Sequence, residues 1–132
     1  MKTITEEHLK KLSHKMQVYF ALFCANQVKE NWTNIPERTK VIRVIELWLE
    51  GKASSKECEV AAADAYAAAD AYAAAAYAAA DAYAAASAAA DAAAAAAAYA
   101  ASDAKGKVIK GQWDYYNELL NFDKNFEKVV LG

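Results

Sequence analysis

The sequence predicts an all-α protein: a compact bundle of five to six helices in a single domain spanning residues 1–132. Apolar residues recur three or four positions apart in residues 9–28 and 41–49, which is the period of a helical face. Of the 44 residues from Ala61 to Ala104, 32 are alanine, the residue with the highest helix propensity. No segment alternates with period two over a useful length, so no sheet is expected.

The first half of the chain predicts two helices. Thr5 is the expected N-cap of a first helix of roughly residues 6–30. A second helix follows Asn34 as cap and Pro36 in the first turn, and Gly51 is expected to close it. This second helix is apolar around much of its circumference, so we expect it at the centre of the core.

A long alanine-rich helix or helix pair, at about residues 55–105, is expected to pack closely on the others. Ser54, Ser55 and Glu57 predict its capped start, and no Gly or Pro interrupts it before Lys105. An unbroken helix of 44 residues would be about 66 Å long, which exceeds the width of a domain this size. We therefore expect a bend or a break. Tyrosine and acidic residues recur on an 11-residue grid, which is interrupted at Ala88 and Ala92, so we place the break near residues 85–88. The two rows of this grid are Tyr66, Tyr77 and Tyr99, and Glu59, Asp70, Asp81 and Asp103.

The C-terminal quarter predicts a further junction and a last long helix. Gly106 and Gly111 are expected to bracket the junction. The stripe of Trp113, Tyr116, Leu119 and Leu120 predicts the helix, and residues 122–131 are expected to form a final turn over one end of the core.

Charge and composition exclude several function classes. The formal net charge is −2, with five Asp and no Lys or Arg in residues 61–104, which indicates neither a nucleic-acid polymer nor a membrane surface as partner. The longest uncharged run of the tract, Ala92–Ser102, has 11 residues, against about 20 needed to span a bilayer. The polar start lacks the apolar run of a secretory signal, so we expect a cytoplasmic protein. Cys24 and Cys58 are expected to be buried thiols.

Tyrosine and aspartate recur in the alanine tract at helical spacings. Three pairs are four residues apart and should be neighbours on a helical face: Tyr66/Asp70, Tyr77/Asp81 and Tyr99/Asp103. Each tyrosine could fill gaps in the core between alanine helices, or present a contact surface, where tyrosine offers area and a hydrogen bond. A third interpretation has the rings stack on a nucleobase while Arg38, Lys40 and Arg43 bind phosphate, although these cations could also form a solvated face.

Nothing in the sequence predicts an enzyme. His8 and His14 are six residues apart and lack partners with the spacing of metal ligands, so no metal or cofactor is expected. No glycine-rich loop, nucleophile elbow or Cys-His signature is present. The aspartates of the tract are too evenly spread to suggest an acid/base pair.

Two resemblances accompany these features. The run from Asn34 to Ser54, the alanine triplets with Asp and aromatic residues, and the segment from Gln112 to Leu120 resemble the alanine-rich immunity protein families of bacteria and their phages. That resemblance covers roughly residues 18–122 and implies an all-helical protein that neutralises a toxin or a host defence component by binding. Residues 92–105 are locally similar to alanine-rich helical antifreeze proteins, but the run has no threonine, and we interpret this similarity as incidental.

The sequence therefore favours a non-catalytic antagonist that sequesters a protein toxin or defence effector in bacterial or phage conflict. The alternative is a sponge that holds a small nucleotide immune signal between tyrosine-rich helices. A third hypothesis is a homo-oligomer whose alanine faces pack against copies of themselves.

Overall fold

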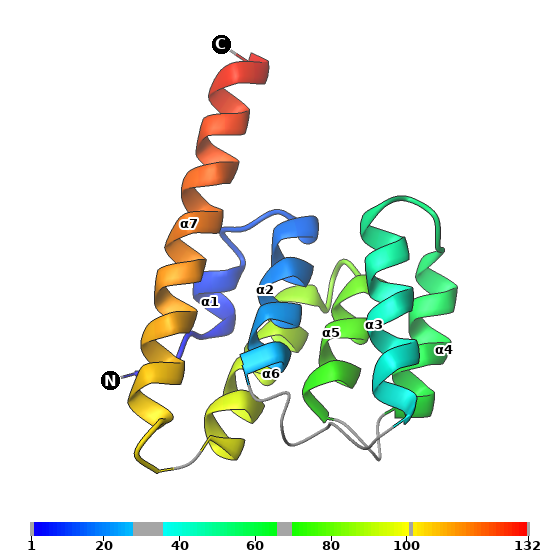
Figure 1. Ribbon diagram of the computed structural model, residues 1–132. Coiled ribbons are helices and arrows are strands. Elements are labelled where there is room, and N and C mark those ends of the chain that lie inside the picture. The colour runs from blue at the N-terminus through cyan, green and yellow to red at the C-terminus, as the bar shows by residue number, and fades with distance from the viewer. Residues whose placement is uncertain (1, 28–35, 66–69, 101, 132) are drawn as a thin grey trace.

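The chain forms seven α-helices in the part that the structure describes (Figure 1). This structure, a computed structural model, describes residues 2–27, 36–65, 70–100 and 102–131, and within them the side chains of all but residues 36–39, 64, 65, 70, 71 and 124–131. No strand occurs among these residues, so the all-α prediction is confirmed, while five to six helices was too few. The helices are α1 (Glu6–Leu9), α2 (His14–Gln27), α3 (Pro36–Leu49), α4 (Ser55–Ala65), α5 (Asp70–Ala80), α6 (Ala85–Tyr99) and α7 (Lys105–Leu131).

The helices stand side by side, with α7 and α1 on one flank and α3 and α4 on the other (Figure 1). Helices α2, α5 and α6 pack against one another between the flanks, and α6 also contacts α1 and α7. One continuous cluster of buried side chains draws on every helix. The last turns of α7 extend beyond the other helices (Figure 1).

The expectation that residues 36–49 form the centre of the core is wrong. Helix α3 lies on the flank, where it packs on α4 and α5, and only Val41 and Ile45 are buried among its described side chains. The centre belongs to α6, which buries eight alanines on two adjoining stripes: Ala85, Ala86, Ala88, Ala89, Ala92, Ala93, Ala96 and Ala97. Alanine brings helix axes close together, so the most crowded position suits the smallest side chains.

The predicted first helix is interrupted. Thr5 caps α1 as expected, but α1 ends at Leu9 and α2 begins only at His14. Ser13 starts the new helix, because its Oγ accepts the Met16 N–H at 3.3 Å while its own N–H donates to Asp123 Oδ2 at 3.0 Å. The N-cap at Ser13 and its hydrogen bond to Asp123 of α7 start a new helix here, although the apolar stripe continues through both helices.

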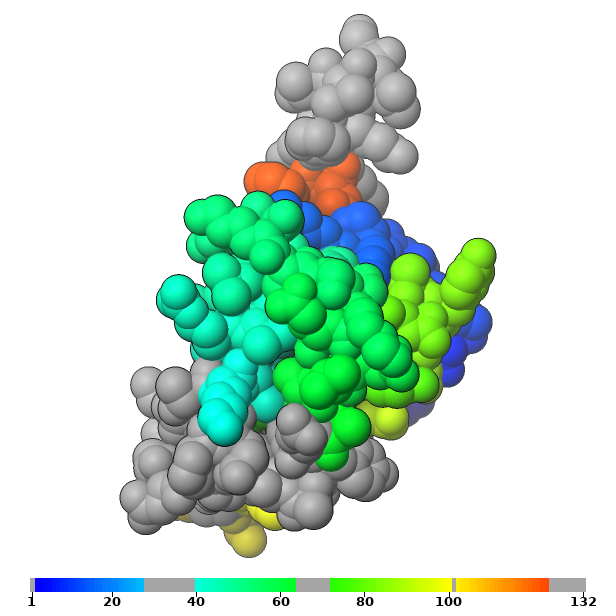
Figure 2. Space-filling view, turned by 90° about the vertical axis from the view of Figure 1, so that its right-hand side faces the viewer, coloured from blue at the N-terminus to red at the C-terminus, as the bar shows by residue number. Residues whose placement is uncertain are grey.

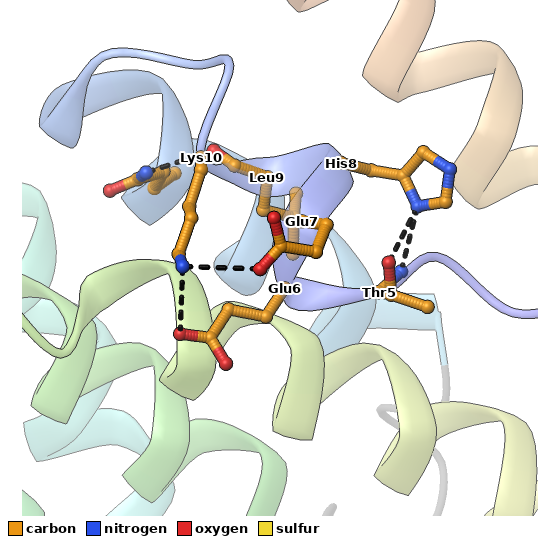
Figure 3. A network of polar contacts seen from close by, with 7 residues as sticks. Thr5, Glu6, Glu7, His8, Leu9 and Lys10 are labelled. Atoms are coloured by element: carbon orange, nitrogen blue, oxygen red, sulfur yellow. Dashed lines mark hydrogen bonds and ion pairs between the residues drawn. The ribbon is translucent and has the colours of Figure 1, made fainter.

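Polar and aromatic contacts stabilise the short α1 and join it to α7. The Thr5 N–H donates to His8 Nδ1 at 3.2 Å, and Lys10 reaches Glu6 and Glu7 at 4.0 and 3.1 Å (Figure 3). The His8 ring meets the Trp113 ring edge-to-face at 4.8 Å, and the Tyr116 hydroxyl donates to the His8 carbonyl at 2.8 Å. The aromatic stripe expected for the last helix thus serves to anchor the N-terminal segment.

The alanine tract divides into α4, α5 and α6, so it is neither one bent helix nor a pair. Its capped start is confirmed, since Ser54 Oγ accepts the Glu57 N–H at 3.2 Å and Glu57 Oε1 accepts the Ser54 N–H at 3.2 Å. The second break lies at residues 81–84, slightly before the predicted 85–88. Asp81 makes it, because Oδ1 accepts the N–H groups of Tyr83 and Ala84 at 2.9 and 3.4 Å.

The predictions for the glycines have opposite outcomes. Gly51 has φ of +77° and ends α3 as expected, since this left-handed conformation suits glycine. Gly106 and Gly111 do not bracket a junction, because both lie inside α7, which continues through the predicted final turn to Leu131. The junction precedes them, because α6 ends at Tyr99 and α7 begins at Lys105.

Candidate functional site

The candidate site is an open groove of about 620 Å³ formed by three successive helices of the alanine tract. Helix α5 contacts both α4 and α6, so it forms the floor and the other two form the walls. Each helix contributes residues one or two turns apart on a single stripe: Glu59, Ala62 and Ala63 from α4, Ala73, Ala74 and Tyr77 from α5, and Ala88, Asp91 and Ala95 from α6. We call this the α4–α6 groove.

The groove is hollow because its lining is mostly alanine. Six of its nine described lining residues are alanines, whose methyl groups leave the backbones of all three helices close to the surface. The same helices are tightly packed on their other sides, since Ala75, Ala76, Ala78 and Ala79 of α5 are fully buried. The groove is thus an unfilled side of a dense scaffold, into which another backbone can approach closely.

Tyr77 is the one bulky side chain among the lining residues that the structure describes, and 48% of its surface is exposed. Two other tyrosines of the tract differ from it, whereas Tyr99 is similarly exposed, at 46%, but does not line the groove. Tyr72 is fully buried, and its hydroxyl donates to Asn26 Oδ1 at 2.7 Å, whereas Tyr83 is fully exposed in the turn after α5. The interpretation of tyrosine as core therefore holds for Tyr72, while Tyr77 is half exposed and lines the groove.

The charge of the α4–α6 groove is negative. Its two ionisable groups besides the phenol are Glu59 on one wall and Asp91 on the other, and no Lys, Arg or His lines it among the described residues. Lys56 lies 3.8 Å from Glu59, but both side chains are mostly exposed, so the pair is weak. The described residues offer the Asp91 carboxylate no hydrogen bond or ion pair.

A second groove of about 620 Å³ lies between α3 and α4, on the flank that Figure 2 views. It has an apolar lining of Val41, Val44, Val60 and Ala61, with Lys40, Lys56 and Glu57 beside them. Lys40 thus lines a groove, as a binding role requires, whereas Arg43 is exposed and lines neither groove. The side chain of Arg38 lies outside the described residues.

The predicted pairs of tyrosine and aspartate are not a continuous row. Tyr66 and the side chain of Asp70 lie outside the described residues. Asp81 follows the end of α5, where its carboxylate accepts backbone N–H groups of the turn before α6, so it does not extend a contact face with Tyr77. The prediction that Tyr99 and Asp103 share a helical face is wrong, because α6 ends at Tyr99 and Asp103 lies in the following turn.

Glu59 and Asp91 are site residues that the sequence did not select. They are 32 positions apart on different helices, so no helical spacing connects them. A signal existed only in Glu59, which falls on the same 11-residue grid as Asp70 and Asp81. The folding of the tract into three helices is what brings the two carboxylates to one groove.

In the described part of the chain, no group of His, Cys, Asp and Glu could hold a metal ion, and none of the helices there is long and apolar enough to span a bilayer. Cys24 and Cys58 are free and buried, and burial raises the pKa of Cys58 to about 11. A protonated, enclosed thiol is a poor nucleophile, so both cysteines serve packing.

No family model matches this sequence, and neither the curated proteins nor the solved structures include one similar to it.

Proposed function

We propose that this protein is a non-catalytic antagonist that sequesters a toxin or defence effector in the cytoplasm of a bacterium or an infected cell, as the resemblance to immunity proteins implies. The observation that carries the proposal is the α4–α6 groove, an open alanine-lined surface with a half-exposed tyrosine at its floor. Tyrosine and close-approach surfaces are both typical of protein recognition.

The lining of the groove favours binding over turnover. It offers methyl groups, one phenol and two carboxylates on opposite walls, and within the described residues it offers no thiol, hydroxyl of Ser or Thr, or imidazole. Such a surface supplies contact area and charge, whereas nucleophilic catalysis needs an activated group next to a base.

The nucleotide-sponge alternative has less support. It requires a tyrosine and a cation at one concave surface, and in the described residues Tyr77 faces Glu59 and Asp91 while Lys40 and Lys56 line a groove without tyrosine. Carboxylates next to the aromatic ring would repel a phosphate. The oligomer hypothesis also has less support, because the alanine faces of α5 and α6 are largely occupied inside the bundle.

The proposal can be tested by capture with matched baits. Wild type, Tyr77→Ala and Tyr83→Ala are immobilised and exposed to lysate of a host cell. Tyr83 is the matched control, since it is exposed but does not line the groove. We expect a protein that wild type and Tyr83→Ala retain, that Tyr77→Ala loses, and whose activity falls when the complex is reconstituted. The proposal is wrong if wild type retains nothing beyond what Tyr77→Ala retains, or if the bound protein stays fully active.

A further inference from the structure

We infer that the occupant of the α4–α6 groove is a basic α-helix of the partner protein, which places its lysines or arginines between Glu59 and Asp91. This inference rests on the proposed function and specifies the chemistry of the partner. It follows from the charge of the two walls, the shape of the floor and the state of the carboxylates.

The charges of the walls select a cationic partner. Glu59 stands on α4 and Asp91 on α6, so a ligand in the groove has a carboxylate on each side. Like charges facing each other cost binding energy, so an acidic segment or a phosphate is rejected, while opposite charges speed association and fix the register. No cation of the described lining residues neutralises the groove from within.

The floor selects a helix. The alanines of three adjacent helices leave a furrow in which Tyr77 is the one large side chain among the described lining residues, and a helix can lie with its backbone close to the alanines. Lysine and arginine stems can lie along the methyl groups while their charged ends reach the two walls. A small organic cation lacks what it needs here, because Tyr77 is the only aromatic lining residue described and a cage requires several.

The carboxylates are free to pair. Asp91 is exposed and unpaired among the described residues, and the contact of Glu59 with Lys56 is an exposed pair at 3.8 Å that a partner can replace. Among the described residues neither carboxylate accepts a backbone N–H in the way that Asp81 does, so both can be neutralised with little effect on folding.

The probe for this inference is a synthetic 18-residue amphipathic helix of leucine and lysine, titrated into the full-length protein and followed by calorimetry and by NMR shifts of the alanine methyl groups. A peptide with glutamate in place of lysine is its control. We expect the lysine peptide to bind, to shift Ala63, Ala74 and Ala95, and to weaken as salt rises, and we expect the glutamate peptide not to bind.

Two pairs of variants locate the binding. Glu59→Gln with Asp91→Asn should weaken the lysine peptide at least tenfold, whereas Glu46→Gln with Glu118→Gln removes the same charge from exposed positions outside the groove and should change affinity less than twofold. Ala63→Leu should block the groove, whereas Ala94→Leu, at an exposed position of α6 outside the lining, should not. Circular dichroism of each variant verifies that it is folded.

The outcomes separate this inference from the proposed function. If the lysine peptide does not bind, or binds equally to both double variants, the inference is wrong. Self-association of the protein that Lys40→Gln abolishes would also overturn the inference. The groove would then be occupied by a second copy of this chain, which supplies Lys40 as its cation. If a captured partner is lost from Tyr77→Ala but kept by the Glu59→Gln and Asp91→Asn variant, the antagonist role stands without a basic helix. If the lysine peptide binds in a charge-dependent way but no captured protein loses activity, the groove binds a basic helix and the antagonist role is wrong.

Discussion

The hydroxyl of Tyr72 donates a hydrogen bond of 2.7 Å to Asn26 Oδ1, which ties α5 to α2. Tyr72 is also the largest of the fully buried side chains. It is the large residue around which the alanine helices close, so its size and its hydroxyl should contribute separately to stability.

Tyr72→Phe removes only the hydroxyl and should lower the free energy of unfolding by about 1 kcal/mol, since it leaves the Asn26 amide without its partner. Tyr72→Ala also leaves a cavity and should cost about 3–5 kcal/mol. Urea denaturation measures both, and Tyr83→Ala, at a fully exposed position, should stay within about 0.5 kcal/mol of wild type. Equal losses for Tyr72→Ala and Tyr83→Ala would contradict the buried position.

Asp81→Ala should lower stability without belonging to a contact face. The Asp81 carboxylate accepts the N–H groups of Tyr83 and Ala84 in the turn before α6, and loss of these hydrogen bonds should cost about 1 kcal/mol. Asp81→Asn keeps an acceptor oxygen and should recover most of this loss. Asp103→Ala, at an exposed turn position, is the control in thermal denaturation, and an equal effect of the two alanine variants would refute the role of Asp81 in the turn before α6.

The two glycines of α7 should respond to alanine with opposite signs. Nothing lies within 4 Å of a Cβ at Gly106, so Gly106→Ala should stabilise the helix by about 0.5 kcal/mol. A Cβ at Gly111 would lie 2.9 Å from Gln27 Nε2, which donates to the Val108 carbonyl at 3.0 Å. Gly111→Ala should therefore cost about 1 kcal/mol, through the broken hydrogen bond.

A double-mutant cycle checks the cause of that loss. In a Gln27→Ala background the obstruction is gone, so Gly111→Ala should become neutral or stabilising. The same penalty in both backgrounds would show that Gln27 is not what Gly111 accommodates.

The buried thiols should make stability fall at alkaline pH. Burial raises the pKa of Cys58 from 9.0 to about 11 and that of Cys24 well above its ordinary value. Because these thiols lose their protons more readily when the chain is unfolded, stability is full below pH 9 and falls as pH rises toward 11, by about 1.4 kcal/mol per pH unit for each thiol. Denaturation at pH 8 to 11 measures the slope, which Cys58→Ala should reduce.

The sequence predicted the helical class, the caps at Thr5 and Ser54 and the turn at Gly51, because these depend on contacts within a few residues. The prediction of which helix lies at the centre was wrong, because that position depends on how closely helices can approach one another. Helix α3 carries larger apolar side chains than α6, yet the alanines of α6 occupy the centre. The site was predicted in part, through Tyr77. Glu59 and Asp91 line one groove only because the chain reverses between α4, α5 and α6. Sequence spacing indicates neighbours within one helix, so it could not predict this pair.

The two buried alanine stripes of α6 make a low-complexity sequence intolerant of substitution. Repetitive composition usually accompanies segments that tolerate drift, insertion and slippage, yet here almost any enlargement would wedge neighbouring helices apart. Inherited variation in this helix should therefore occur at exposed positions such as Ala94 and Ala98, while the buried positions remain alanine because larger side chains do not fit there.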